Sequence, residues 1–444
     1  MPAAATPADH PLHRMIARLV LLRPGEGAPL LLSGGYFFLV LFSYYLLRPI
    51  RDTFGIRGDL KDLPLLWTGT SVAMLAATPV FALLVSRLPR RRFIPLTYRF
   101  FALNIVLFYG ALMVLPDAAH TALGYAFYIW LSVFNLFAIS VFWGYMADLF
   151  RPEQGARLFA AIAVGGTLGA MAGSLVPALI AERIGALHLM PLSALTLELA
   201  VWCVLALASR FHVGAPATPG SVIRGEPTRR VWSGFVLIAR SRYLQFLCLY
   251  MLLFTLTTTF LTFEQLRVVK SAFESSDART AAFARMDLAA NGLALVTQLF
   301  ITGRFVRRLG IGAALLLLPV LTLLGFMALW IGPALGWPML GVFAAFYVSR
   351  RGLHFAVDRP AREMLYTPLG PDEKYKSKSF IDTFVYRGGD LMGAWMQAIG
   401  AVAANAAPIA MGICAVWMSI AGGLALTNRR IAACREGAGS AGSA

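Results

Sequence analysis

Long apolar stretches alternate with short polar breaks along almost the whole chain. Twelve such stretches, each about 18 to 25 residues long, run from Leu30 to Thr427. The hydrocarbon layer of a bilayer is about 30 Å thick, so a helix that rises 1.5 Å per residue needs roughly 20 apolar residues to cross it. The pattern therefore predicts twelve transmembrane helices, approximately over residues 30–50, 64–86, 93–115, 121–148, 158–181, 191–209, 243–266, 286–306, 311–331, 337–357, 379–402 and 406–427.

Composition agrees with a chain whose solvent is the bilayer. Hydrophobic residues make up 58% of the 444 positions and charged residues only 14%. That balance leaves too few polar side chains to cover a water-soluble core. Inside lipid the backbone must bond to itself, which helices achieve segment by segment. We expect an all-α polytopic membrane protein.

The net charge of +17 is concentrated in particular loops. The turns near Pro116, Gly332 and Asn405 carry no Lys or Arg, whereas the intervening segments carry many. Cytoplasmic loops are enriched in these residues, so the pattern predicts that both termini lie on the cytoplasmic side. The cytoplasmic basic groups are Arg14, Arg18 and Arg23; Arg87, Arg90, Arg91 and Arg92; Arg151 and Arg157; those from Arg210 to Arg242; Arg304, Arg307 and Arg308; Lys374, Lys376 and Lys378; and Arg429 and Arg430.

The chain divides into two halves of six stretches each. A segment rich in Pro, Gly, Ser and Arg separates them and has the composition of a linker. In LHRMIARLVLLR, the first apolar residues lie on one helical face and Arg14 and Arg18 on another, which predicts an interfacial helix. The predicted segments are 1–29 (N-terminal cytoplasmic segment), 30–209 (first bundle), 210–242 (cytoplasmic linker), 243–428 (second bundle) and 429–444 (disordered tail).

Features recur between the halves at an almost constant offset. Arg48 and Glu264 end the first and seventh stretches 216 residues apart, and paired glycines at 165–166 and 388–389 recur 223 residues apart. With Pro152 and Pro368, and the basic segments that start at Ser86 and Gly303, four matches occur in the same order and predict a parallel duplication, as in the major facilitator architecture. Gly165, Gly169 and Gly173, and likewise Gly389 and Gly393, form faces of small residues that allow close helix approach. These faces serve either a gliding contact between the halves or ordinary tight packing.

Charges within the first stretch are the first candidate site. Arg48 and Arg51 are three residues apart and share a helical face, and Asp52 follows. Pro49 between them is expected to bend or break the helix. Two guanidinium groups could bind a phosphate or carboxylate. Alternatively, they reach the outer headgroups with Asp52 as a partner.

Two further groups lie in the second half. Glu264 and Arg267 are three residues apart and could pair with each other. Alternatively, Glu264 faces Arg48 or Arg51 across a central cavity. Asp382, Arg387 and Asp390 begin the eleventh stretch, where the last two either form a local ion pair or serve as substrate or gate charges.

The uncharged polar candidates are Asn135, Asn291 and Gln298, and single amides in membrane helices commonly hold helices together. Glu198 has no charged neighbour in its stretch and is a candidate proton site. The four cysteines form no CxxC pair, and no phosphate loop, HExxH motif or nucleophile elbow occurs. We therefore expect no enzyme activity, no metal and no cofactor.

Several segments resemble one family. They are EMLYTPLGPDEKYKSKSFIDTFVYRGGD from Glu363, LLRPIRDT around Arg48, FWGYMADLFRPEQGARLFAAIAVGGTLGAMAGS from Phe142, and the context of Glu264. Together they resemble the ATP:ADP antiporter (nucleotide translocase) family of plastids and intracellular bacteria, which is related to the major facilitator superfamily. The family pattern has Lys at the position of Arg51, an acidic residue near Asn135, and Gly-Lys-Ser around Gly389 and Asp390; Glu264 keeps its type.

The resemblance implies a multi-pass carrier of the bacterial inner membrane. Our leading hypothesis is an alternating-access secondary transporter of an organic anion or nucleotide-like solute, with Arg48, Arg51, Glu264, Arg267, Arg387 and Asn135 binding substrate and Asp52, Asp382, Asp390 and Glu198 coupling or gating. A second hypothesis is a proton-coupled carrier of a neutral, zwitterionic or chelate solute. A third is a non-transporting scaffold or sensor that binds a partner through the linker.

Overall fold

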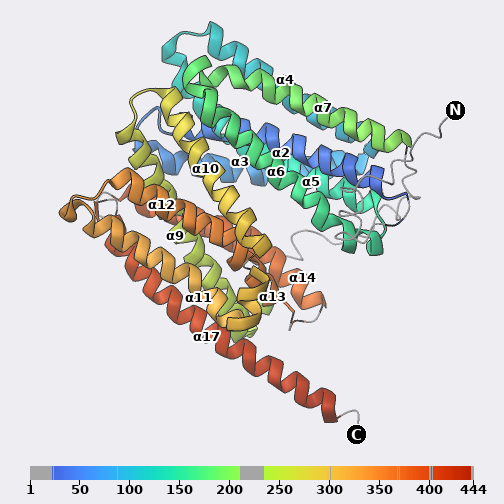
Figure 1. Ribbon diagram of the computed structural model, residues 1–444, viewed down its shortest axis with the longest axis vertical. Coiled ribbons are helices and arrows are strands. Elements are labelled where there is room, and N and C mark those ends of the chain that lie inside the picture. The colour runs from blue at the N-terminus through green and yellow to red at the C-terminus, as the bar shows by residue number, and fades with distance from the viewer. Residues whose placement is uncertain are drawn as a thin grey trace, which may run out of the picture. The chain divides into compact units, whose positions relative to one another are not determined.

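The computed structural model describes residue 23 and residues 25–87, 89–210, 235–300, 302–367, 369, 371–399, 402 and 404–441. The predicted interfacial helix and most of the predicted linker lie outside this part of the chain. The described residues form helices joined by short turns, with no strand among them (Figure 1). The predicted all-α class is confirmed.

Helix boundaries follow the apolar stretches closely in the first half. Six long helices are present there: α2 (Gly27–Gly55), α3 (Leu63–Arg87), α4 (Arg90–Val114), α5 (Asp117–Leu149), α6 (Pro152–Ile184) and α7 (Leu189–Arg210). Short 3-10 turns, η2 (Leu60–Asp62) and η3 (Ala186–His188), precede α3 and α7.

The second half contains more interruptions. Its helices are α9 (Arg242–Ala272), α10 (Ser276–Phe300), α11 (Thr302–Ile331), α12 (Met339–Leu353), α13 (Arg359–Met364), α14 (Pro371–Phe380), α15 (Tyr386–Ala398) and α17 (Ala406–Ala441). The 3-10 turn η4 (Pro333–Leu335) precedes α12. Two π-helical turns, η5 (His354–Asp358) and η6 (Ile381–Val385), join α12 to α13 and α14 to α15. Such wide turns often mark functional positions.

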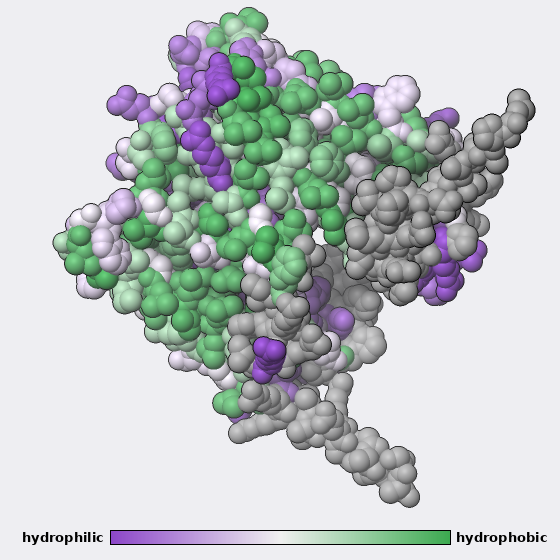
Figure 2. Space-filling model, viewed as in Figure 1, coloured by the Kyte–Doolittle hydropathy of each residue, from purple (hydrophilic) through white to green (hydrophobic). Residues whose placement is uncertain are grey.

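Nine helices within the described ranges are long and apolar enough to cross a membrane. The other three predicted spans fall on α10, on α12 to α13 and on α14 to α15. These segments are helical but carry more charge; α10, for example, includes Asp277, Arg279, Arg285 and Asp287. Apolar residues nevertheless cover much of the visible surface of the helices (Figure 2). Twelve crossings therefore fit the structure and stay a prediction.

The structure preserves the predicted repeat. The long helical segments of the first half begin at residues 27, 63, 90, 117, 152 and 189, and those of the second half at 242, 276, 302, 339, 371 and 406. Each start thus recurs 212 to 222 residues later. Packing recurs as well, because α4 packs along α7 and the equivalent α11 packs along α17 (Figure 1).

The contacts divide the chain into two compact units. Unit 1 comprises Met1–Phe54 with Val72–Ser221, and unit 2 comprises Gly55–Ser71 with Val222–Ala444. The short segment Gly55–Ser71 joins unit 2 through polar contacts: Lys270 Nζ donates to the Gly58 carbonyl at 2.6 Å, and the Trp395 indole donates to the Thr68 hydroxyl at 3.1 Å. The sequence placed this segment in the first bundle, since nothing local reveals these distant partners.

The glycine faces pack helices within each unit. A Cβ atom added at Gly169 of α6 would lie 2.2 Å from the carbonyl oxygen of Phe38 in α2. In unit 2, a Cβ atom at Gly393 of α15 would lie 2.8 Å from Cβ of Thr259 in α9. Both contacts join equivalent helices of the repeat. They correspond to tight packing, the simpler of the two interpretations.

The last helix is longer than expected. The sequence predicted that the twelfth span ends at residue 427 and that a disordered tail follows over 429–444, whereas α17 continues as helix to Ala441. Hydropathy falls after Thr427, but the residues that follow contain no proline that would stop the helix. The end of the apolar stretch therefore did not mark the end of the helix.

A buried carboxylate ties together the starts of α2 and α6. Glu26 is 7% exposed and accepts hydrogen bonds from both terminal nitrogens of Arg157, at 2.8 and 3.2 Å. It also accepts from the Gln154 amide at 3.1 Å and the Arg23 backbone N–H at 3.0 Å. The Arg157 hydrogen bonds, assisted by these other donors, outweigh burial and lower the pKa of Glu26 to about 2.

Replacing Gly169 by Ala should destabilise the protein by about 1 to 3 kcal/mol, since the added methyl group meets the α2 backbone. Gly110→Ala in α4 is the matched control because its Cβ atom would meet nothing within 4 Å. It should have no cost. Thermal unfolding in detergent would measure both, and equal melting temperatures for the two variants would contradict the proposed contact.

Glu26→Gln should lower stability at neutral pH by about 2 kcal/mol, a typical value for hydrogen bonds to a charged group. The folded-state pKa of Glu26 lies below its ordinary value, so its ionised form stabilises the fold above about pH 4.5 and this contribution is lost as the pH falls toward 2. The difference in melting temperature between parent and variant should therefore shrink in acid. Glu274→Gln, at an exposed position, is the control. A pH-independent difference would contradict the assignment.

Candidate functional site

The first predicted group lies near the C-terminal end of α2, in unit 1. The helix runs through Pro49 without ending, so the predicted break does not occur. Arg51 donates from Nε and Nη2 to Asp52 Oδ1, at 2.9 and 2.6 Å, and its guanidinium lies 4.9 Å from the ring centroid of Tyr128. The Arg48 guanidinium lies 5.8 Å from the ring of Tyr45. Arg51 is thus already paired with Asp52, the partner named in the alternative to anion binding.

The second group lies on α9, in unit 2. Arg267 Nη1 lies 3.3 Å from Glu264 Oε2, and its Nη2 donates to the Gln397 side-chain carbonyl on α15 at 2.7 Å. The local ion pair is therefore formed.

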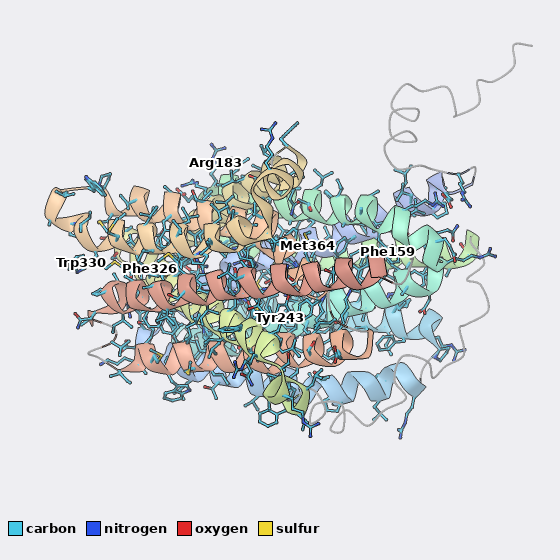
Figure 3. All side chains as sticks on the ribbon, turned by 90° about the horizontal axis from the view of Figure 1, so that it is seen from below. Phe159, Arg183, Tyr243, Phe326, Trp330 and Met364 are labelled. Carbon is cyan, nitrogen blue, oxygen red and sulfur yellow. The ribbon has the colours of Figure 1, made fainter. Side chains whose placement is uncertain are left out.

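Glu264 and Arg267 also line a pocket of about 420 Å³, together with Phe326, Leu329, Trp330 and residues 404–408. Phe326 and Trp330 lie near one end of the helices, whereas Tyr243 lies farther along (Figure 3).

The third group is only partly assembled. Arg387 and Asp390 of α15 form an ion pair at 3.6 Å, beside the glycines that pack on α9. Asp390 is 9% exposed, whereas Asp382 lies exposed in η6. The geometry again gives the local pair that the spacing of three residues allows.

Glu198, the predicted proton site, has a charged partner on another helix. Glu198 of α7 accepts two hydrogen bonds from Arg99 of α4, at 2.7 and 3.0 Å, so it is held in a bidentate ion pair. The sequence could not show this, because the partners are 99 residues apart. The pair lies about midway along both helices, and its side chains are 52% and 36% exposed for Arg99 and Glu198.

The uncharged candidates differ in role. Gln298 donates to the Phe355 carbonyl at 3.1 Å and so joins α10 to η5, as expected for an amide that holds helices together. Asn135 is half-buried on α5, and the described residues give its side chain no hydrogen-bond partner. The amide nitrogen of Asn291 is buried without a partner among the same residues.

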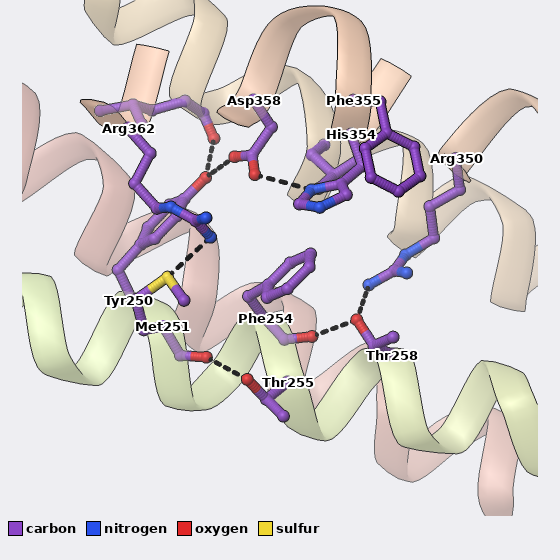
Figure 4. A network of polar contacts seen from close by, with 12 residues as sticks. Tyr250, Met251, Phe254, Thr255, Thr258, Arg350, His354, Phe355, Asp358 and Arg362 are labelled. Atoms are coloured by element: carbon purple, nitrogen blue, oxygen red, sulfur yellow. Dashed lines mark hydrogen bonds and ion pairs between the residues drawn. The ribbon is translucent and has the colours of Figure 1, made fainter. Parts of the chain in front are cut away.

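Sequence analysis did not single out a larger polar network inside unit 2. It surrounds Phe254 of α9 and includes Tyr250, Arg350, His354, Asp358 and Arg362; we call these six residues the Phe254 cluster (Figure 4). Four of them come from α12, η5 and α13, where RRGLHFAVDRPAR follows an apolar stretch and resembles an ordinary topology signal. The missed clue was that two charges and a histidine lie inside the predicted tenth span.

Arg350 is the most deeply buried member, at 3% exposure. Its Nε donates to the Thr322 hydroxyl at 2.9 Å, and its Nη2 donates to those of Thr257 and Thr258, both at 3.0 Å. The guanidinium also lies 5.6 Å from the centroid of the Phe254 ring. Three neutral hydroxyls and an aromatic face thus surround a full positive charge.

Arg362 lies near the same ring, 5.9 Å from its centroid. Its Nη1 contacts Met251 Sδ at 3.0 Å, and a thioether is only a weak acceptor. In the described part of the chain, neither Arg350 nor Arg362 forms an ion pair with a carboxylate. Their guanidinium groups therefore retain unused donors.

The single carboxylate of the cluster is occupied by other groups. Asp358 is 1% exposed and accepts from the Tyr250 hydroxyl at 2.5 Å and from Nδ1 of His354 at 3.0 Å. The His354 ring stacks on Phe254, with centroids 4.6 Å apart. Two arginines and one aspartate leave the cluster with a net positive charge even when His354 is neutral.

A neighbouring ion pair shows the contrast. Arg351, next in sequence to Arg350, pairs with Asp287 of α10 at 2.5 Å, and Asp287 also accepts from the Tyr347 hydroxyl at 3.2 Å. This is the usual arrangement of a buried charge, in which the opposite charge lies within reach. Within the described residues, no three His, Cys, Asp or Glu side chains lie close enough to hold a metal ion.

Solved structures share this fold at low sequence identity. A bacterial homologue of the iron transporter ferroportin in an inward-facing state aligns with a TM-score of 0.65 and 11% identity over 91% of this chain and 100% of that chain. A POT-family peptide transporter in complex with alafosfalin aligns at 0.63 and 15% identity, over 94% and 98%. The nucleoside transporter NupG aligns at 0.57 and 15% identity, over 90% and 98%. This likeness establishes the fold.

No family model matches the sequence, and no curated protein matches it either.

Glu198→Gln should lower stability in lipid nanodiscs by about 1 to 3 kcal/mol, because it leaves the Arg99 charge without its partner. The double variant Arg99→Leu with Glu198→Leu should restore parental stability, since an apolar pair avoids the desolvation cost of both ions. Thermal unfolding of the three proteins would test this. An unchanged Glu198→Gln variant would show that the pair does not hold α4 to α7.

Proposed function

We propose that this chain is a secondary transporter that carries a small anionic solute across a membrane by alternating access, and that the Phe254 cluster binds the anion. The observation that carries the proposal is the burial of Arg350, a residue that is only 3% exposed. In the described structure, the hydrogen-bond partners of its guanidinium are three threonine hydroxyls. Nearby, Arg362 has a thioether as its polar contact.

A buried charge without an ion-pair partner is costly inside a membrane. An arginine at the centre of a membrane helix costs roughly 2.5 to 3.5 kcal/mol on insertion scales, so a charge is kept there chiefly where a partner or a solute repays the cost. Arg351 has such a partner in Asp287. Arg350 and Arg362 have none of that kind, and planar guanidinium groups match the paired oxygens of carboxylates and phosphates.

The fold supports transport. The solved structures with this fold include transporters of nucleosides and peptides, one of them in complex with sulfate and another with 5-aminolevulinic acid. The resemblance to the ATP:ADP antiporter family favours a nucleotide-like anion and an exchange mechanism. The distribution of Lys and Arg favours a multi-pass orientation in the bacterial inner membrane with both termini in the cytoplasm.

The residues predicted from the sequence stay candidates for binding the solute. Arg51, Arg267 and Arg387 each form an ion pair with a neighbouring carboxylate. Such local pairs could open for a solute at the cost of one interaction each. We rank the Phe254 cluster above them because its arginines need break no ion pair.

Arg362→Gln should reduce anion uptake into proteoliposomes about tenfold or more, the loss expected when a hydrogen bond to a charged group worth about 1.5 to 3 kcal/mol is removed. The solutes would be labelled nucleotides, organic acids and phosphate, with an uncharged nucleoside and a neutral peptide for comparison. Arg48→Ala would test the sequence-predicted site in parallel.

Arg183→Gln is the control, because it removes a positive charge at an exposed position near the end of α6. It should transport as the parent does. If the parent carries only uncharged solutes, or if Arg362→Gln and a conservative Arg350→Lys variant carry anions at the parental rate, the anion assignment is wrong.

A further inference from the structure

We propose that His354 couples a proton to the anion, so that both bind together at the Phe254 cluster and are carried together. This inference rests on the anion site proposed above and adds the coupling ion and its acceptor atom. It moves the proton site away from Glu198, which is paired with Arg99.

The hydrogen bonds identify the atom that would take the proton. Asp358 accepts from Tyr250, and an ionised carboxylate offers only acceptors. The imidazole nitrogen that faces it, Nδ1, must therefore carry the hydrogen in the neutral ring. This assignment follows from the network and leaves Nε2 with its lone pair. The described residues give Nε2 no hydrogen-bond partner, and the His354 side chain is 17% exposed.

The backbone supports this geometry. His354 and Asp358 lie at the first and last positions of the π-helical turn η5, and their spacing of four residues brings the side chains within 3.0 Å. Phe254 stacks on a face of the imidazole at an interplanar angle of 24°. Protonation at Nε2 forms one N–H bond with a proton from water and adds one positive charge, without requiring the ring to move.

Charged and titratable groups around His354 come from several elements. Arg350, Asp358 and Arg362 belong to the same α12–η5–α13 segment as His354. Arg362 also interacts electrostatically with Asp382 of η6. Tyr250 of α9 donates to Asp358, and Tyr386 of α15 and Cys414 of α17 interact electrostatically with Arg350. Within this set the two arginines oppose a third positive charge, and Asp358 favours it.

An anion at the arginines changes that balance. It neutralises part of the positive potential at the imidazole, so it should strengthen proton binding there. Binding free energies are reciprocal, so the proton must strengthen anion binding by the same factor. Such coupling typically amounts to fivefold or more, and it would tie the flux of an anion to the proton gradient.

The test uses the purified full chain with sulfate and benzenesulfonate, two anions that do not themselves titrate between about pH 5.5 and 8, the range in which histidine does. Their affinities would be measured by calorimetry at both ends of that range. The parent should bind more tightly at the lower pH by about fivefold or more. His354→Gln should bind each anion with the same affinity at both pH values, because it lacks the group that takes the proton.

His188→Gln is the matched control. His188 lies in unit 1, where its ring nitrogen is 2.9 Å from the Tyr109 hydroxyl, and its removal should leave the pH dependence intact. A second measurement needs no variant: adding sulfate to the weakly buffered parent should draw protons from the medium, as a pH-sensitive dye would report.

Each outcome decides a specific point. A parent that binds neither anion at either pH overturns the proposed anion site, and the coupling with it. Binding with equal affinity at both pH values, or without proton uptake, overturns the coupling alone. An undiminished increase in the His354→Gln variant overturns the assignment to this residue.

Discussion

Hydrocarbon offers no hydrogen bonds and little screening, so every polar group in this chain must find its partner within the protein. The backbone meets this demand inside each helix. Helices are then held to one another by close contact, as where Gly169 and Gly393 meet α2 and α9, and by hydroxyl bonds such as Tyr36 to Tyr98 at 2.7 Å. Against this background, a full charge without an opposite charge stands out.

The charges of the chain satisfy the constraint in two ways. Some form local pairs, at spacings of one or three residues along a helix, as in Arg51 with Asp52 and Arg267 with Glu264, and others pair between helices, as in Arg351 with Asp287. The Phe254 cluster differs because two arginines face hydroxyls, a thioether and one aromatic ring, while its aspartate is engaged by Tyr250 and His354. The excess positive charge is the reason for proposing that an anion binds there.

The two halves share their order of helices but differ in continuity. In the first half, α5 and α6 are unbroken over 33 residues each. Their counterparts contain the π-helical turns η5 and η6, which carry His354, Asp358 and Asp382. A π-helical turn shifts the side chains that follow it around the helix axis, so charged residues can face a common point that a regular helix would not give them. The repeat therefore supplies the scaffold, and the π-helical turn η5 carries two residues of the proposed anion site.

The sequence by itself determined the membrane class, the approximate helices and the duplication, because hydropathy acts over single segments and offsets can be counted along the chain. It also gave the local ion pairs at Glu264 and Arg387 as one of two alternatives each, since their partners lie within one helical turn. Only the tertiary structure decided which distant groups meet: Glu198 with Arg99, Gly58 with Lys270, and Phe254 with residues about 100 positions later. Such encounters depend on how helices pack, and no local pattern of residues records that.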